Sequence, residues 1–403
     1  MAVRAPHLER TLRCFTLGAF ALLSRELDDG GELPFAFEEH GSPTRPTLYE
    51  YRPLVRPFVE QRAAALRRLD DAEIALEELR REPAAAIFAR AHVGAKATED
   101  DAIFRSVLLP LVAATAEACG GFDWHDDSFA HAYVELERSL LGSERSYGAV
   151  APLVGVSCGA QIDLGGGLRV RAAATGELSR LWPDTTGLLP KDFGREPDRL
   201  CVLELERALP AAAAEPPDAP GEIADAVSAL RLATAAPVAA GPVIFERLDW
   251  RPYGIRPVLP IAATAPPGEP TRVDPFRGRL AADLLERLPF ADDDADLAEA
   301  LDRWELSLFQ DEPLRGDSLR LVVSSLLGGA EAVLRGAVLL GETGRARAEH
   351  AEKLRAGEPD ATRRALVETL AHGDRRKLIR ELDDALLGVR PRPTTYFARA
   401  LAS

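Results

Sequence analysis

Cysteine is scarce in this chain of 403 residues. Four are present, and no two of them form a C-x-x-C motif. Zinc ribbons and dithiol redox motifs use closely spaced cysteines, so the spacing argues against both. Because Cys14, Cys119, Cys158 and Cys201 are far apart in the sequence, we expect them to be buried free thiols in a reducing compartment.

Phosphate-binding and hydrolase motifs are also absent. The sequence contains no P-loop, no G-x-G-x-x-G, no H-E-x-x-H and no G-x-S-x-G. The glycine run Gly165–Gly167 lies between two segments of alternating apolar and polar residues, which is typical of a hairpin turn. Nucleotide hydrolysis and hydride transfer are therefore not indicated, and we expect no cofactor.

Two acidic clusters lack the pattern of a metal site. An EF-hand loop beginning at Asp292 would need Gly and Glu where the chain has Leu297 and Arg303. The cluster is better explained as an acidic helix start. Asp127 and His131 stand four residues apart, but a metal site would need further ligands from elsewhere in the chain. We expect no bound metal.

Long apolar runs are missing too, since none approaches the ~18 residues of a membrane span. The segment Cys14–Leu23 imitates a signal sequence, but the charged residues 24–29 follow it in place of a cleavage site. Its apolar residues recur at helical spacing, which favours an amphipathic packing helix. We therefore expect a cytoplasmic protein without membrane contact.

Charge and composition give a broad class. The formal net charge of −15 argues against general polyanion binding but leaves room for a local basic groove. Abundant Ala, Arg, Leu and Pro with little Lys are typical of a high-GC bacterial coding bias. Apolar residues make up 46% of the chain, enough for packed cores.

The periodicity predicts a mostly helical α+β fold in three parts. Residues 1–145 are predicted to form a helical region, with an extended connection from Leu33 to Pro57 that includes a strand near Leu48–Tyr51. Residues 146–275 are predicted to form a small α+β region with short antiparallel strands and a β-hairpin. Residues 276–403 carry helical stripes such as Leu297, Leu301, Trp304 and Leu308, and are predicted to form an all-α bundle.

Two histidines fall in this predicted bundle. Arg345 and His350 are five residues apart on one predicted helix, which places their side chains about 140° apart around the axis. His372 precedes Gly373 where a helix ends, with Arg364 upstream. Histidine serves as a general acid or base near neutral pH, so these four residues are our catalytic candidates.

The C-terminal sequence resembles a known family. The segments Ala300–Leu308, Asp317–Gly328 and Leu334–Gly341, with Tyr147–Gly155 and Ala229–Leu232 upstream, are similar to ApeA-like HEPN proteins over roughly residues 147–390. The resemblance implies a helical bundle, homodimerisation through it and, in active members, metal-independent RNA cleavage in antiviral defence. Active members carry R-x(4–6)-H, in which His moves a proton and Arg stabilises the phosphorane.

The chain departs from that motif around His372. Val367, Leu366 and Ala365 occupy the three positions where the motif places Arg, and Arg364 lies one residue outside the window. Two hypotheses follow: a HEPN-like ribonuclease acting through His372 or His350 with an Arg, or a non-catalytic HEPN-derived subunit that binds a protein or nucleoprotein partner. An enzyme of secondary metabolism is a third, weaker hypothesis.

Overall fold

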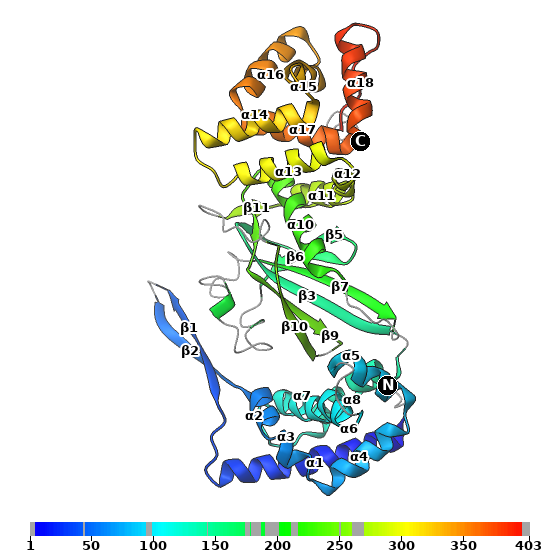
Figure 1. The fold of residues 1–403 in the computed structure, drawn as a ribbon. Helices are drawn as coiled ribbons and strands as arrows, with labels where there is room; N and C mark the ends of the chain where they lie inside the picture. The colour runs from blue at the N-terminus through cyan, green and yellow to red at the C-terminus, as the bar shows by residue number, and fades with distance from the viewer. Residues whose placement is uncertain are drawn as a thin grey trace.

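The structure is a computed structural model of the chain. It describes residues 5–42, 45–93, 99–142, 144–173, 178, 187–189, 201–210, 217–249, 251–259 and 270–396. Figure 1 shows a helical unit at the N-terminal end, a twisted sheet in the middle and a helical bundle at the C-terminal end. The expected mostly helical α+β fold is confirmed.

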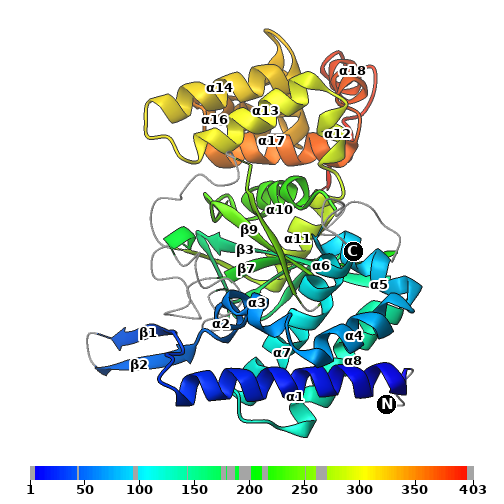
Figure 2. The same ribbon diagram turned by 60° about the horizontal axis from the view of Figure 1, so that its bottom comes forward.

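The N-terminal unit is built from short helices around a core of its own. Leu8, Leu12, Phe15, Ala19 and Leu23 are all buried on one face of the first helix, as their spacing predicts. Figure 2 shows this helix lying along the outer side of the unit. The elements are α1 (Pro6–Asp28), α2 (Val55–Gln61), α3 (Ala63–Leu66), α4 (Asp70–Arg80), α5 (Pro83–Val93), α6 (Glu99–Ile103), the π-helix η1 (Phe104–Leu108), α7 (Leu109–Cys119) and α8 (Asp126–Leu141).

A two-stranded arm leaves this unit between α1 and α2. Its strands, β1 (Phe35–Ser42) and β2 (Arg45–Pro53), pair antiparallel from Phe35–Pro53 outward. Figures 1 and 2 show the arm projecting away from the helices. The strand expected near Leu48–Tyr51 is present and is longer than predicted, because a whole partner strand precedes it.

The central sheet has the strand order β10-β9-β3-β7-β6-β5. The predicted hairpin is present as β5 and β6, joined through three glycines with positive φ. The short strand β4 pairs in parallel with β11 beside this sheet. The strands are β3 (Glu144–Val154), β4 (Val156–Cys158), β5 (Ile162–Gly165), β6 (Leu168–Ala172), β7 (Cys201–Pro210), β8 (Ala239–Ala240, paired with β3), β9 (Val243–Leu248), β10 (Arg251–Pro257) and β11 (Thr271–Val273).

Helices cover one face of the sheet and continue into the bundle (Figure 1). Asp294 caps α13 by accepting hydrogen bonds from the backbone N–H groups of residues 296 and 297. This agrees with the acidic helix start expected there. The helices are α10 (Ala219–Thr234), α11 (Pro275–Leu285), α12 (Pro289–Asp292), α13 (Ala295–Ser307), α14 (Leu314–Leu327), α15 (Ala332–Leu340), α16 (Gly344–Ala356), α17 (Pro359–His372) and α18 (Arg375–Leu386).

The described residues pack around two large apolar cores. One lies inside the N-terminal unit, from Leu8 to Leu140. The other runs without interruption from the sheet through α10 and α11 into the bundle, from Tyr147 to Leu382. Two core clusters do not by themselves define three units, so the three-part division stays a prediction.

One described helical stretch, Glu99–Cys119, is long and apolar enough to cross a membrane by length and composition. The sequence analysis had found no run of that length, because acidic residues open the stretch. Of its apolar window, 72% is buried inside the protein. Such burial is what a core helix of a globular unit shows.

Candidate functional site

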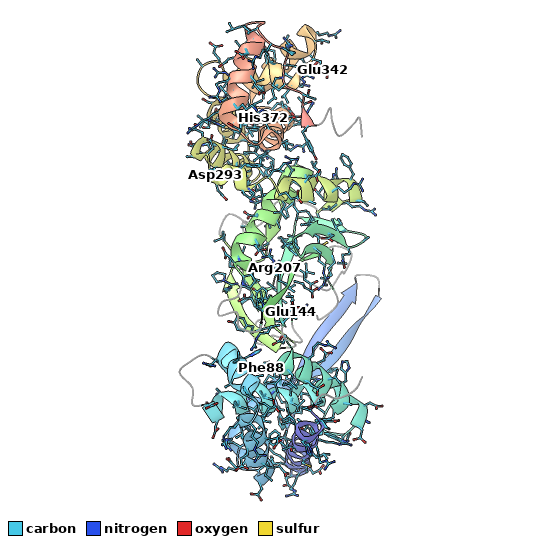
Figure 3. The ribbon with its side chains drawn as sticks, turned by 90° about the vertical axis from the view of Figure 1, so that its right-hand side faces the viewer. Phe88, Glu144, Arg207, Asp293, Glu342 and His372 are labelled. Carbon is cyan, nitrogen blue, oxygen red and sulfur yellow. The ribbon has the colours of Figure 1, made fainter. Side chains whose placement is uncertain are left out.

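The bundle holds the four candidate residues on two helices. Arg345 and His350 lie on α16, and Arg364 and His372 lie on α17. The second helix is closely defined by its sequence: the Glu358 side chain caps its first turn, Pro359 follows the cap, and Gly373 ends it with a left-handed φ of 78°. Figure 3 shows His372 at this end of the helix.

The charge of Arg364 on α17 acts on His350 on α16. The pKa of His350 is lowered, first by burial and then by the positive charge of Arg364, with a smaller contribution from Lys353. Its Nδ1 atom is buried and has no hydrogen-bond partner among the described residues. The imidazole of His350 is therefore held in the neutral form at neutral pH, next to a guanidinium group.

Arg345 does not form a pair with His350. It lies on the exposed first turn of α16, and its charge acts on Glu349, whose pKa is lowered mainly by the hydrogen bond from Lys353. This follows from helix geometry, because residues four apart share a face while residues five apart do not. This agrees with the separation of about 140° around the axis expected from the sequence spacing.

His372 has a carboxylate partner instead of an arginine. Its Nε2 atom lies 3.3 Å from Glu381 Oε2 on α18, and both side chains are partly buried. Arg364 is eight residues earlier on α17, which is about 12 Å along the axis. Arg364 is therefore separated from His372 along the helix, whereas its charge acts on His350.

A groove adjoins the His372–Glu381 pair. It has a volume of about 400 Å³ and is lined by charged residues of both signs. Lys377 lies within 4.0 Å of Glu381 on the same helix, so cationic groups already neutralise part of the acidic charge. The lining residues are Lys377, Arg380, Glu381, Asp383, Asp384 and Arg390.

His350 and Arg364 were both predicted from the sequence as candidate residues, but the effect of one on the other was not predicted. The two side chains come from different helices, and only the packing of α16 against α17 sets their separation. Glu381 was missed as the partner of His372 for the same reason. Within the described ranges, no group of three or more His, Cys, Asp or Glu residues is placed to hold a metal ion.

Comparison with known proteins adds no relative. No family model, no curated protein sequence and no solved structure matches the chain significantly.

Proposed function

We propose that this chain is a HEPN-like bacterial defence protein of the cytoplasm that acts on RNA as a metal-independent endoribonuclease. The observation that carries this proposal is the half-buried His350, whose pKa is lowered by burial and by the charge of Arg364. A neutral imidazole accepts a proton and a guanidinium stabilises an oxyanion, and RNA cleavage by internal attack needs both.

The chemistry follows from these two groups. His350 accepts the proton of a ribose 2′-OH, and the 2′-oxygen attacks the adjacent phosphorus. Arg364 stabilises the negative charge that develops on the phosphorane oxygens. The bond to the 5′-oxygen then breaks, and that oxygen takes the proton that His350 accepted in the first step, which returns the imidazole to its neutral form. The products are a 2′,3′-cyclic phosphate and a 5′-hydroxyl.

The proposed active form is a homodimer through the C-terminal bundle. Three leucines on α13 and α14 are unusually exposed: Leu306 at 47%, Leu314 at 64% and Leu321 at 51%. Leu314 and Leu321 are seven residues apart and share one face of α14. Leu314→Glu with Leu321→Glu should convert the dimer to a monomer in sedimentation analysis. An unchanged sedimentation coefficient would exclude this face as the interface.

The test of the enzyme is cleavage of mixed RNA substrates in the presence of EDTA. His350→Ala and Arg364→Ala should each lower the rate by about 10²–10⁴-fold, the usual contribution of a general acid or base. His372→Ala is the matched control and should retain activity, because Glu381 already engages that imidazole. Loss of activity on addition of EDTA would exclude the metal-independent mechanism. Loss of activity in His372→Ala alone would mean that His372, and not His350, is the catalytic histidine.

A second function, a non-catalytic binding or assembly subunit, is favoured by one observation. Val367 occupies the position where the family motif places Arg, and its side chain is fully buried, so that position contributes to packing only. Under this proposal wild-type protein would cleave no RNA, and substitution at His350 would leave binding to an RNA or protein partner unchanged. Filter binding with the same RNA pool separates the two proposals.

A further inference from the structure

Two cysteines that are distant in the sequence meet in the core. Cys158 ends β4 and Cys201 begins β7, and their Sγ atoms are 3.0 Å apart. That separation is about 1 Å longer than a disulfide bond of about 2.04 Å. Both residues are buried, with exposed fractions of 5% and 1%. All four thiols are free, as expected, but only these two are buried, because Cys14 is exposed and Cys119 is half-buried.

The two thiols differ in chemistry. The hydrogen bond between the two thiols holds the pKa of Cys158 below its usual value in spite of burial, and the positive charge of Arg171 adds to this effect. The same hydrogen bond, together with burial, raises the pKa of Cys201. Thiolate character is therefore concentrated on Cys158, which is the property of an attacking thiol, while Cys201 keeps its proton.

A route from solvent reaches the neighbourhood of the pair. A cleft of about 500 Å³ is lined by Gly159, which follows Cys158 in the chain, and by Val273, which is the partner of Cys158 in the β4–β11 pair. A small neutral oxidant can enter a cleft of this size, whereas a protein oxidoreductase cannot reach a sulfur that is nearly fully buried.

We propose that Cys158 and Cys201 form a reversible disulfide in response to hydrogen peroxide, and that this disulfide links β4 to β7. The Cys158 thiolate attacks one peroxide oxygen, the O–O bond breaks, and hydroxide leaves with a proton as water. The resulting sulfenic acid is attacked by the sulfur of Cys201, which gives up its proton. The S–O bond breaks and a second water leaves. A dithiol reductant reverses the reaction.

The positions of β4 and β7 in the fold determine which elements the proposed disulfide would hold together. β4 pairs only with β11 among the described strands, and β11 runs directly into α11, the first helix after the sheet. A disulfide from β4 to β7 would therefore fix the connection to the bundle onto the central strand of the sheet. Formation of this disulfide is independent of the proposed RNA cleavage, because it requires neither His350 nor Arg364.

The test uses the full chain with Cys14→Ser and Cys119→Ser, which removes the exposed and half-exposed thiols. Folded protein is treated with hydrogen peroxide, unfolded in an alkylating agent and mapped by peptide mass spectrometry. We expect a cross-linked peptide that joins Cys158 to Cys201, lighter by two hydrogen atoms, and its loss on reduction. Two fully alkylated cysteines after treatment would overturn the proposal, provided that the same protein oxidises when unfolded.

Single variants test the order of the steps. Cys201→Ser should stop the reaction at a sulfenic acid on Cys158, which dimedone traps, and Cys158→Ser should leave Cys201 unreacted. Equal dimedone labelling of the two variants would contradict the assigned roles. Because either variant alters a buried site, peptide mapping of the chain that carries only Cys14→Ser and Cys119→Ser gives the primary result without them.

Discussion

The two ends of the molecule are attached to the sheet in different ways. Between the sheet and the bundle, apolar side chains pack continuously, and one buried ion pair there joins Arg231 of α10 to Glu305 of α13. Between the N-terminal unit and the sheet, the contact is polar: His92, Arg145 and Asp249 meet there, all with side chains less than 5% exposed. Figure 3 shows Phe88, whose ring centroid lies 4.0 Å from that of His92, on the N-terminal side of this junction, with Glu144 and Arg207 on the side of the sheet.

The difference has an energetic meaning. Elements that share one continuous apolar core unfold together as one cooperative unit. Two parts of a protein that are joined only by a few charged groups unfold as separate cooperative units. We infer that the sheet and the bundle unfold together and that the N-terminal unit unfolds on its own. The following predictions address this comparison, from the largest expected effect to the smallest.

The largest effect is expected from Arg231→Met. The guanidinium donates to Glu305 at 3.1 Å and to the carbonyl of Val238 at 2.7 Å, and both charged side chains are at most 2% exposed. Removing it leaves Glu305 buried without its cation, which should lower the free energy of unfolding by about 3–5 kcal/mol. Hydrogen exchange should show lost protection in both the sheet and the bundle. Loss confined to the bundle would show that the two are separate units.

The pH dependence of this variant sharpens the test. Burial raises the pKa of Glu305 above its unfolded value, and Arg231 opposes that rise. A raised folded pKa contributes stability below the unfolded pKa and loses it as the pH rises through the folded value. Arg231→Met should therefore regain more stability than wild type on acidification from neutral pH. Arg231→Met with Glu305→Gln is the matched control and should show no such gain.

The next effect is expected from Leu12→Ala in the N-terminal core. This side chain is fully buried on α1, and its truncation should cost about 2–5 kcal/mol. Hydrogen exchange should increase in the N-terminal helices and stay unchanged in the sheet and bundle. Leu17→Ala, on the exposed side of the same helix, is the control. An equal increase in the bundle would contradict independent unfolding.

A smaller effect is expected at the polar junction from Asp249→Asn. Asparagine tolerates the left-handed φ of 57° at this position and retains an oxygen for the Ser146 backbone N–H. It removes the negative charge that faces Arg145 and His92, so we expect a loss of about 1–3 kcal/mol. Urea unfolding should then separate into two resolved transitions. A single transition at a lower urea concentration would show that the N-terminal unit does not separate from the sheet at this junction.

The smallest effect is expected from Glu349→Gln on α16. Its pairing with Lys353 lies on the surface, so global stability should not change measurably. Glu349 also raises the pKa of His350, which burial and Arg364 lower. The variant should therefore lower the pKa of His350 further, as followed by NMR titration. An unchanged pKa would mean that Glu349 does not act on the proposed catalytic histidine.

Local patterns in the sequence predicted the helices and the hairpin well, because these depend on residues a few positions apart. The stripe from Leu8 to Leu23 and the turn at Gly165–Gly167 are examples. The segment that begins at Asp317 lies inside α14, which starts earlier, at Leu314, directly after Pro313, whose ring restricts the backbone at that point.

Contacts between distant segments could not be predicted in this way. The pairing of β3 with both β7 and β9, the meeting of Cys158 with Cys201 and the approach of Arg364 to His350 all depend on how complete elements pack. A period of 2 or 3.6 residues gives the face on which a side chain lies but not the element that covers that face. The candidate residues were therefore predictable, whereas their partners were not.

The parallel pair of β4 and β11 has a consequence for folding during synthesis. The N-terminal unit is complete once α8 has left the ribosome, and its contacts are formed within that stretch of chain. Val156 of β4, by contrast, must wait for Thr271 of β11 before it gains its neighbour. Long-range pairing of this kind slows folding. The nascent chain therefore carries a finished helical unit ahead of an unpaired β4, whose pairing with β11 coincides with the emergence of the first bundle helix.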